Sequence, residues 1–329
     1  MGYTRGYMKS KRIQVAMLAV LIGLIVGVYT QHQTVLDWVR LRGYSAPTTV
    51  AQLASDDTMT ARARHLFYVN HPAVESGKAF TGNCPAGGEK TVVLGCYVGQ
   101  DAGIYLYAVT DVRLNGVQQV TAAHETLHAA YRRLSSSERK RVDAMLTDYY
   151  QHGLTDQRIK DTIELYKKSE PNDVVNEMHS VFGTEAPNLP PALEQYYQRY
   201  FSNRAKVTAY TASYQGEFTN RQNKVASDDA QLKTLKQQID TNSAQLDQQK
   251  AALDSQSAQL QSERSNGQVT TYNGGVGPYN AAVNSYNALL GSTKNLIKQY
   301  NDLVDQRNAI ALEEQQLARA LSADSLPSK

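Results

Sequence analysis

His124 and His128 stand four residues apart in a segment without proline. Residues at this spacing lie on one face of an α-helix, so the two imidazoles can bind one metal ion. Glu125 directly follows the first histidine, and its carboxylate can take a proton from a metal-bound water. These three residues predict metal-assisted hydrolysis.

The residues around this pair favour a buried helix. Between positions 121 and 130, the only charged or titratable side chains are the two histidines and the glutamate. An exposed helix would carry Lys, Glu or Gln between the histidines, and a core histidine seldom has a second one a turn away. We therefore expect a zinc site rather than a chance pair of histidines.

A catalytic zinc ion usually has three protein ligands and keeps a fourth position for water. Residues 172–184 offer Glu177 on a second predicted helix, with Gly183 as its expected end. The helix is predicted from an apolar stripe formed by Val174, Val175, Met178 and Phe182. Three other acidic residues are alternative third ligands: Asp143, Glu164 and Glu185.

Two short segments resemble the gluzincins, the thermolysin-type zinc metallopeptidases. The resemblance rests on residues 124–128 and on Asn176-Glu177, followed by Ser180 and by Phe182-Gly183-Thr184. It implies that His124, His128 and Glu177 bind Zn²⁺. It also implies that Glu125 is the general base in peptide-bond hydrolysis. The stretch between His128 and Glu177 leaves room for two further helices.

The chain departs from the gluzincin pattern at Val181, where the family often has an acidic residue one turn after its ligand glutamate. The group that orients a ligand histidine must then come from elsewhere, with Ser180 and Glu185 as candidates. The resemblance also implies a donor that stabilises the oxyanion. His179 is our first candidate, although it could instead orient a ligand or lie at the surface. The alternatives are three tyrosines: Tyr131, Tyr149 and Tyr150.

The amino terminus predicts attachment to a membrane. Residues 1–12 are basic, and an apolar run extends from Ile13 to Tyr29. We expect a cytoplasmic tail at 1–12, a transmembrane anchor at 13–30 and a catalytic domain outside the cell membrane. A cleaved signal peptide is the alternative, although no small-residue cleavage site follows the run.

The two cysteines, Cys84 and Cys96, precede the metal-binding segment. An even number of cysteines in an extracytoplasmic domain predicts one disulfide, and two unpaired thiols are the alternative. Their spacing is too wide for a Cys-x-x-Cys metal site, so neither is expected to be a ligand.

Residues 45–205 predict one α+β domain with a zincin-like fold. Short helices are expected around residues 50–54 and 61–69, and strands at 91–94 and 104–109. The second strand could border the substrate, as in zinc peptidases, or be an ordinary interior strand.

Residues 206–321 predict an antiparallel helical hairpin, or coiled coil, with its tip loop near 265–278 and a disordered tail at 322–329. A heptad repeat runs through the first arm at Val225, Leu232, Ile239, Leu246, Leu253 and Leu260. It resumes in the second arm at Leu289, Leu296, Leu303, Ile310 and Leu317. Four Tyr-Asn pairs share the seven-residue spacing, and either pack across the hairpin or bind glycans or a partner: Tyr272-Asn273, Tyr279-Asn280, Tyr286-Asn287 and Tyr300-Asn301.

A net charge of only +3, without a basic stripe, argues against a nucleic-acid partner. The expected function is that of a membrane-anchored zinc metallopeptidase acting on peptide or protein substrates. The alternative is a cell-surface adhesion or scaffold protein with a structural or idle metal site. Its hairpin could bind a protein partner or self-associate. Glu125 favours the enzyme, because a structural zinc needs no base.

Overall fold

This computed structural model describes residues 17–18, 32–84, 94–99 and 103–322. Residues 32–41 form a helix. The named elements follow in chain order: α2 (Thr48–Asp56), α3 (Ala61–Val69), β1 (Ala73–Glu75), α4 (Gly77–Asn83), β2 (Gly95–Val98), β3 (Gly103–Tyr107), η1 (Val112–Leu114), α5 (Val117–Arg132), α6 (Ser136–Asp148), η2 (Tyr149–Gly153), α7 (Gln157–Ser169), α8 (Val174–Glu185), α9 (Pro191–Tyr197), α10 (Arg204–Ser265) and α11 (Val269–Ala320).

The chain forms two compact units. The first contains residues up to Tyr214 and those from Ala320 onward, and the second contains Gln215–Arg319. The predicted mixture of helices and strands is found in the first unit, which is mostly helical around a small sheet. The first turns of α10 belong to the first unit, which extends to Tyr214, whereas the sequence analysis placed the division at 205/206.

The sheet has the strand order β1-β3-β2, with β3 parallel to β1 and antiparallel to β2. The strand predicted at 104–109 corresponds to β3, but it lies in the middle of the sheet. Its interpretation as a substrate edge is therefore wrong, because both of its sides are already paired. A strand was also expected at 91–94. Residues 91–93 lie outside the described part of the chain, and the strand observed next to them, β2, begins at Gly95.

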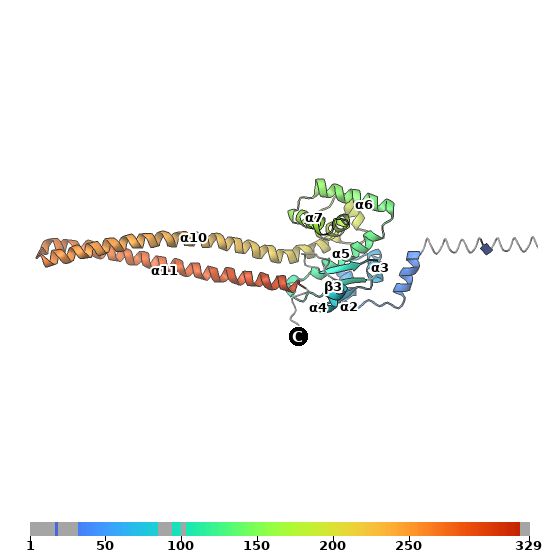
Figure 1. The fold of residues 1–329 in the computed structure, drawn as a ribbon, viewed down its shortest axis with the longest axis horizontal. Helices are drawn as coiled ribbons and strands as arrows, with labels where there is room; N and C mark the ends of the chain where they lie inside the picture. The colour runs from blue at the N-terminus through green and yellow to red at the C-terminus, as the bar shows by residue number, and fades with distance from the viewer. Residues whose placement is uncertain (1–16, 19–31, 85–93, 100–102, 323–329) are drawn as a thin grey trace, which may run out of the picture. The chain divides into compact units, whose positions relative to one another are not determined.

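Helix α5 is the centre of the first unit. It contacts β2 and β3 on one side and α8 on another, and α2 and α3 also pack against it (Figure 1). Its start is fixed by Gly116, whose φ of +104° is a conformation that favours glycine. A Cβ atom there would lie 3.0 Å from the backbone oxygen of Tyr210.

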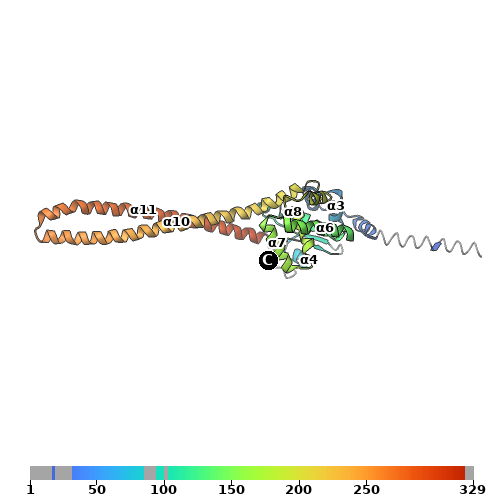
Figure 2. The ribbon, with the colours of Figure 1, turned by 90° about the horizontal axis from the view of Figure 1, so that it is seen from above.

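The two helices expected between the histidines and Glu177 are confirmed as α6 and α7, and both pack against α8 (Figure 2). Ser135 and Glu138 form a capping box at the start of α6. The sequence analysis predicted that α8 ends at Gly183. This prediction is wrong, because the helix continues to Glu185. Gly183 instead permits close packing, since a Cβ atom there would lie 2.3 Å from the Leu127 side chain on α5.

Among the described residues, no helix has both the length and the apolar character needed to cross a bilayer. The predicted anchor at 13–30 falls outside this part of the chain except at residues 17 and 18. The predicted cytoplasmic tail at 1–12 also falls outside it, as does the tail beyond Ser322.

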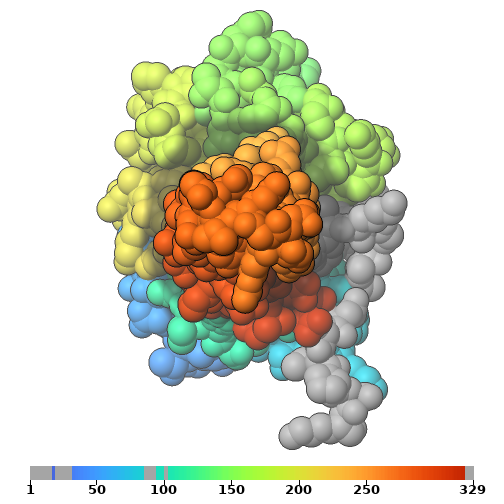
Figure 3. Space-filling model, turned by 90° about the vertical axis from the view of Figure 1, so that its left-hand side faces the viewer, coloured from blue at the N-terminus to red at the C-terminus, as the bar shows by residue number. Residues whose placement is uncertain are grey.

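Helices α10 and α11 pair in the second unit as the predicted hairpin (Figure 1). Arg221 contacts Glu313 and Arg307 contacts Asp229, at 3.3 and 3.0 Å, so the arms run antiparallel. Leu246 of the first heptad repeat is buried. In Figure 3 the orange residues near the end of α10 and the start of α11 face the viewer.

The tip loop is much shorter than predicted, because α11 already begins at Val269. Gly274, Gly275, Gly277 and Pro278 lie inside this helix although they are poor helix formers. Gly275 approaches the other arm so closely that a Cβ atom would lie 2.7 Å from Leu260. Packing between the arms thus overrides local helix propensity.

The Tyr-Asn pairs lie along the second arm. Their four tyrosines are half-buried, and their four asparagines are exposed. Thr293, buried at 4 % exposure, occupies the gap in the seven-residue spacing. This burial pattern favours packing across the hairpin over glycan binding by the rings.

The start of α10 is part of the core of the first unit. Val207 is fully buried, and the Thr211 hydroxyl donates a hydrogen bond to the carbonyl of Thr184, at 2.9 Å. A chain truncated after Ala205 is therefore expected to be about 3 kcal/mol less stable than one truncated after Tyr214. Denaturant unfolding of the two truncated chains measures this difference. Equal stabilities would contradict the placement of these turns in the core.

Candidate metal centre

Three predicted ligand residues meet where α5 packs against α8. The Nε2 atoms of His124 and His128 are 3.0 Å apart. The carboxylate of Glu177 faces both of them, with oxygens 3.6 Å from His124 Nε2 and 3.4 Å from His128 Nε2. Among the described residues, these side chains form a group whose donor atoms all lie within 4.8 Å of one another, so they could hold a metal ion.

Glu177 lies in the first turn of α8, where the helix dipole favours a negative charge. Its side chain is buried. Burial raises the pKa of this carboxyl, but the charges of His128 and His124 and hydrogen bonds from His124 and Tyr166 outweigh it. The pKa of Glu177 is therefore below its ordinary value, and the group is a carboxylate at neutral pH.

A cleft of about 700 Å³ opens beside the three ligand residues. Glu125 lines the same cleft and is only 6 % exposed. Gly95, Cys96 and Tyr97 of β2 also line the cleft. Glu125 thus has access to the space beside the possible metal position.

The strand β2 passes very close to α5 at Gly95. A Cβ atom at this position would lie 2.4 Å from the Thr121 methyl and 3.1 Å from Glu125 Oε1. No side chain fits there without movement of the strand or the helix. Gly95 therefore brings the backbone of β2 directly against the catalytic candidate Glu125.

The predicted disulfide between Cys84 and Cys96 is confirmed, with the two Cα atoms 5.9 Å apart. Cys84 follows α4, and Cys96 belongs to β2. The bond therefore ties the strand that borders the cleft to the neighbouring helix. Neither cysteine contributes to the group of possible metal ligands.

His179 is fully buried and is not among the residues that line the cleft. Its Nε2 atom pairs with the hydroxyl of Tyr196 at 2.8 Å, and the Tyr197 hydroxyl donates to its backbone carbonyl at 2.7 Å. Burial, together with the charges of His128 and His124, lowers the pKa of His179 to about 3. The structure thus places His179 as a neutral residue in the core behind the cleft. Contact between His179 and an oxyanion stays a prediction, and the His179 side chain does not reach the cleft directly.

The hydroxyls of the three alternative oxyanion donors each donate a hydrogen bond to another protein group. Tyr131 lines the cleft but donates to Asp143 at 2.8 Å. Tyr149 donates to the carbonyl of Asn188 at 2.9 Å. Tyr150 donates to Glu164.

The alternative third ligands have other partners as well. Asp143 accepts the Tyr131 hydrogen bond, Glu164 pairs with Lys167 at 2.7 Å, and Glu185 pairs with Arg158. Ser180 was a candidate for orienting a ligand histidine. Among the described residues, however, its buried hydroxyl has no hydrogen-bond partner, and neither has His128 Nδ1.

Two residues near the site were given no role in the sequence analysis. Tyr166 on α7 lines the cleft and hydrogen bonds to Glu177. Asn176 also lines the cleft, and its buried amide oxygen has no hydrogen-bond partner within the part of the chain that the structure describes. The sequence analysis named Asn176 only as the residue before Glu177 in the gluzincin-like segment. No sequence pattern distinguishes Tyr166 from the other tyrosines of the chain.

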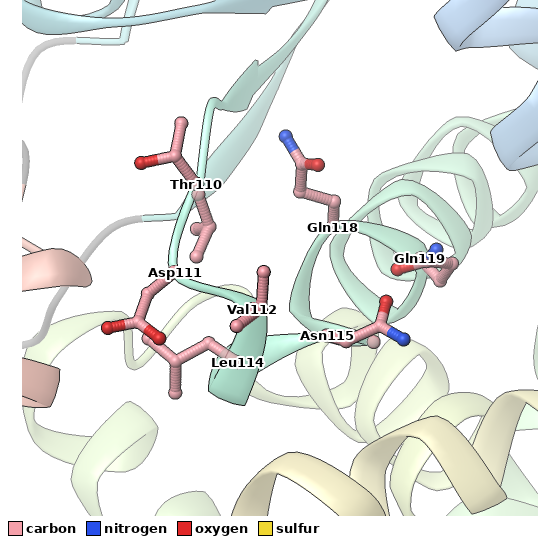
Figure 4. Close-up of a pocket in the computed structure, with 9 residues that line it drawn as sticks. Thr110, Asp111, Val112, Leu114, Asn115, Gln118 and Gln119 are labelled. Atoms are coloured by element: carbon pink, nitrogen blue, oxygen red, sulfur yellow. The ribbon is translucent and has the colours of Figure 1, made fainter.

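A second hollow, of about 300 Å³, lies in the segment between β3 and the first turn of α5 (Figure 4). Its polar side chains include Thr110, Asp111, Gln118 and Gln119. Asp111 is paired with Arg113 at 2.7 Å. The hollow contains no histidine or cysteine, so its residues offer no counterpart to the group of ligands in the cleft.

The site combines two imidazoles, one carboxylate and a further buried carboxylate at the edge of an open cleft. Nitrogen and oxygen donors in this combination suit several divalent transition metals. A cleft that reaches the donors would leave room for water or a substrate beside the ion. Comparison of the chain with protein-family models, curated proteins and solved structures finds no match.

Proposed function

We propose that this protein is a membrane-anchored, extracytoplasmic zinc metallopeptidase with a gluzincin-like site. The observation that carries the proposal is the convergence of His124, His128 and Glu177 beside a cleft that Glu125 also lines. A purely structural site would not need Glu125 at this position. It would more often have a fourth protein ligand instead of an open side.

The donor separations support zinc. A tetrahedral zinc ion with bonds near 2.0–2.1 Å holds its ligand atoms about 3.3 Å apart. The two Nε2 atoms are 3.0 Å apart, and one Glu177 oxygen lies 3.4 Å from His128 while the other lies 3.6 Å from His124, so each of these separations is close to that value. Little movement is therefore needed for all three to bind one ion.

The proposed reaction is hydrolysis of a peptide bond. Bound zinc would supply a water of lowered pKa and would polarise the substrate carbonyl. Glu125 would accept a proton from that water and pass it to the leaving amide nitrogen. Tyr166 would hold the Glu177 carboxylate in position through its hydrogen bond.

The substrate is proposed to lie in extended form along β2. Of the described strands, β2 pairs only with β3, and its residues line the cleft. An extended peptide can add to such an edge through backbone hydrogen bonds. The unpartnered amide oxygen of Asn176 could accept a further N–H from the substrate.

An extracytoplasmic location is part of the proposal. The apolar run at 13–29 would anchor the chain, and the basic residues before it would keep the amino terminus in the cytoplasm. The Cys84–Cys96 disulfide supports an oxidising compartment for the domain.

Incubation of the purified full chain with a mixed peptide library should produce new amino termini, detected by mass spectrometry. Treatment with 1,10-phenanthroline should abolish them, and added zinc should restore them. The 1,7 isomer, which cannot chelate, is the matched control. A chain that binds one zinc but cleaves no peptide would favour the adhesion or scaffold alternative.

A further inference from the structure

The helix formed by residues 32–41 has an apolar face that no described residue covers. Four large apolar side chains are exposed: Val35 at 47 %, Leu36 at 50 %, Trp38 at 61 % and Val39 at 56 %. Val35, Trp38 and Val39 lie on one side of the helix because they are three or four residues apart. Large apolar groups gathered on one helix face are typical of an interaction surface.

The opposite face of this helix is bound to the rest of the first unit. Asp37 is buried and accepts hydrogen bonds from both terminal nitrogens of Arg133, at 2.7 and 2.9 Å. His65 Nε2 is 2.7 Å from the same carboxylate. Arg40 donates to the carbonyl of Val69 at 2.6 Å. The helix is therefore attached firmly, and its apolar face points away from the domain.

Arg133 connects this attached helix to the metal-binding helix. It directly follows α5, the helix that carries His124 and His128. A charge-assisted, two-pronged pair between Arg133 and Asp37 has a defined geometry. The orientation of the exposed apolar face is thus coupled to the orientation of the metal-binding helix.

The preceding sequence indicates what covers the apolar face. The apolar run at 13–29 ends three residues before residue 32, and three residues span about 10 Å at most. A chain anchored by that run has its next residues at the membrane surface. Tryptophan is enriched in that region, and helices with one apolar face lie in it. The Arg42 guanidinium lies 5.3 Å from the centre of the Trp38 ring, where it could meet anionic headgroups.

We propose that the apolar face of residues 32–41 inserts into the lipid headgroup region and that the Asp37–Arg133 pair thereby fixes the domain relative to the membrane. This inference rests on the membrane anchor in the proposed function and does not require peptidase activity. The helix would contact phospholipid headgroups and the upper part of the acyl chains. The metal-binding cleft would then have a set orientation above the bilayer.

Trp38 is the single tryptophan of the chain, so its fluorescence reports directly on this helix. The full chain would be reconstituted into vesicles of phosphatidylcholine and phosphatidylglycerol. We expect Trp38 emission to be quenched more by lipid brominated near the headgroup than by lipid brominated near the chain end. We also expect quenching by aqueous iodide to fall several-fold on reconstitution, compared with the chain in dilute detergent.

A double variant, Val35→Ser with Val39→Ser, should restore access of iodide to Trp38, because it removes apolar contact on an already exposed face. Val112→Ser is the matched control, since Val112 is 86 % exposed and lies far along the chain from this helix. This control should leave the quenching by brominated lipid unchanged.

Sedimentation of the vesicles separates the possible failures. Protein that sediments with vesicles while Trp38 stays open to iodide would overturn the inference and leave the anchor intact. Protein that does not sediment with them would overturn the anchor and the inference together. Peptide cleavage is measured separately, so failure of the proposed catalysis would be seen independently of either result.

Discussion

Replacing Glu125 with glutamine is expected to lower kcat/KM for peptide cleavage by a factor of about 10² to 10⁴, with the metal retained. Glutamine has nearly the same shape but cannot accept the proton from water. Glu125 is buried and lines the cleft, but it does not belong to the ligand group. The variant should therefore bind metal as the native chain does. Elemental analysis and cleavage of a defined peptide measure the two effects.

Glu170→Gln is the control for this experiment, because Glu170 also lines the cleft. It removes the same negative charge from the same space without touching the proposed base. Its kcat/KM should remain within about tenfold of the native value, as expected for loss of a partly exposed charge. If Glu125→Gln keeps most of the native activity, another group is the base and the mechanism is wrong.

The second large effect is expected from Glu177→Ala, which should weaken metal binding by more than about 100-fold. Loss of residues that only support a ligand already costs about 10- to 100-fold in affinity, so loss of a ligand should cost more. The carboxylate of Glu177 contributes the only oxygen donors within the group formed with His124 and His128. Elemental analysis after dialysis, followed by chelator competition, would measure the loss.

Glu185→Ala is the matched control for the ligand experiment. Glu185 lies on the same helix, lines the same cleft and was an alternative third ligand, yet it pairs with Arg158. Its removal should leave the metal content unchanged. Equal metal in the native chain and Glu177→Ala would show that the third ligand lies elsewhere. Thermal unfolding of both variants would exclude a general loss of fold.

The ligand group could be predicted because each part of it has a local signature. His124 and His128 share a helix face by spacing alone, and Glu177 stands on an amphipathic segment that had to pack on something. The disulfide followed from the number of cysteines. Each of these predictions needed only the spacing, the local pattern or the number of a few residues.

The cleft could not be predicted in the same way, because long-range packing forms it. Strand order decides that β2 and not β3 borders the site, and no pattern within either strand encodes that order. Tyr166 reaches Glu177 only because α7 packs against α8. His179 has the right residue type and a nearby position in sequence, but it is buried in the core.

The errors in the helices have a related cause. Gly183 was expected to end its helix, and Gly275 and Pro278 fall in the range expected for the tip loop, in keeping with the usual local effect of these residue types. In the structure, Gly183 and Gly275 instead lie where a neighbouring side chain comes too close for a Cβ atom. Contacts between helices therefore explain these glycines better than the local sequence does.

The close approach of β2 to α5 at Gly95 also restricts how the cleft could be redesigned. Any larger residue at this position would have to displace the Thr121 methyl or the strand itself, and the displacement would reach Glu125. Specificity would have to be altered farther from this contact, at lining residues such as Tyr97 or Arg132. A mutational library for new substrates should therefore keep glycine at position 95 and diversify the cleft around it.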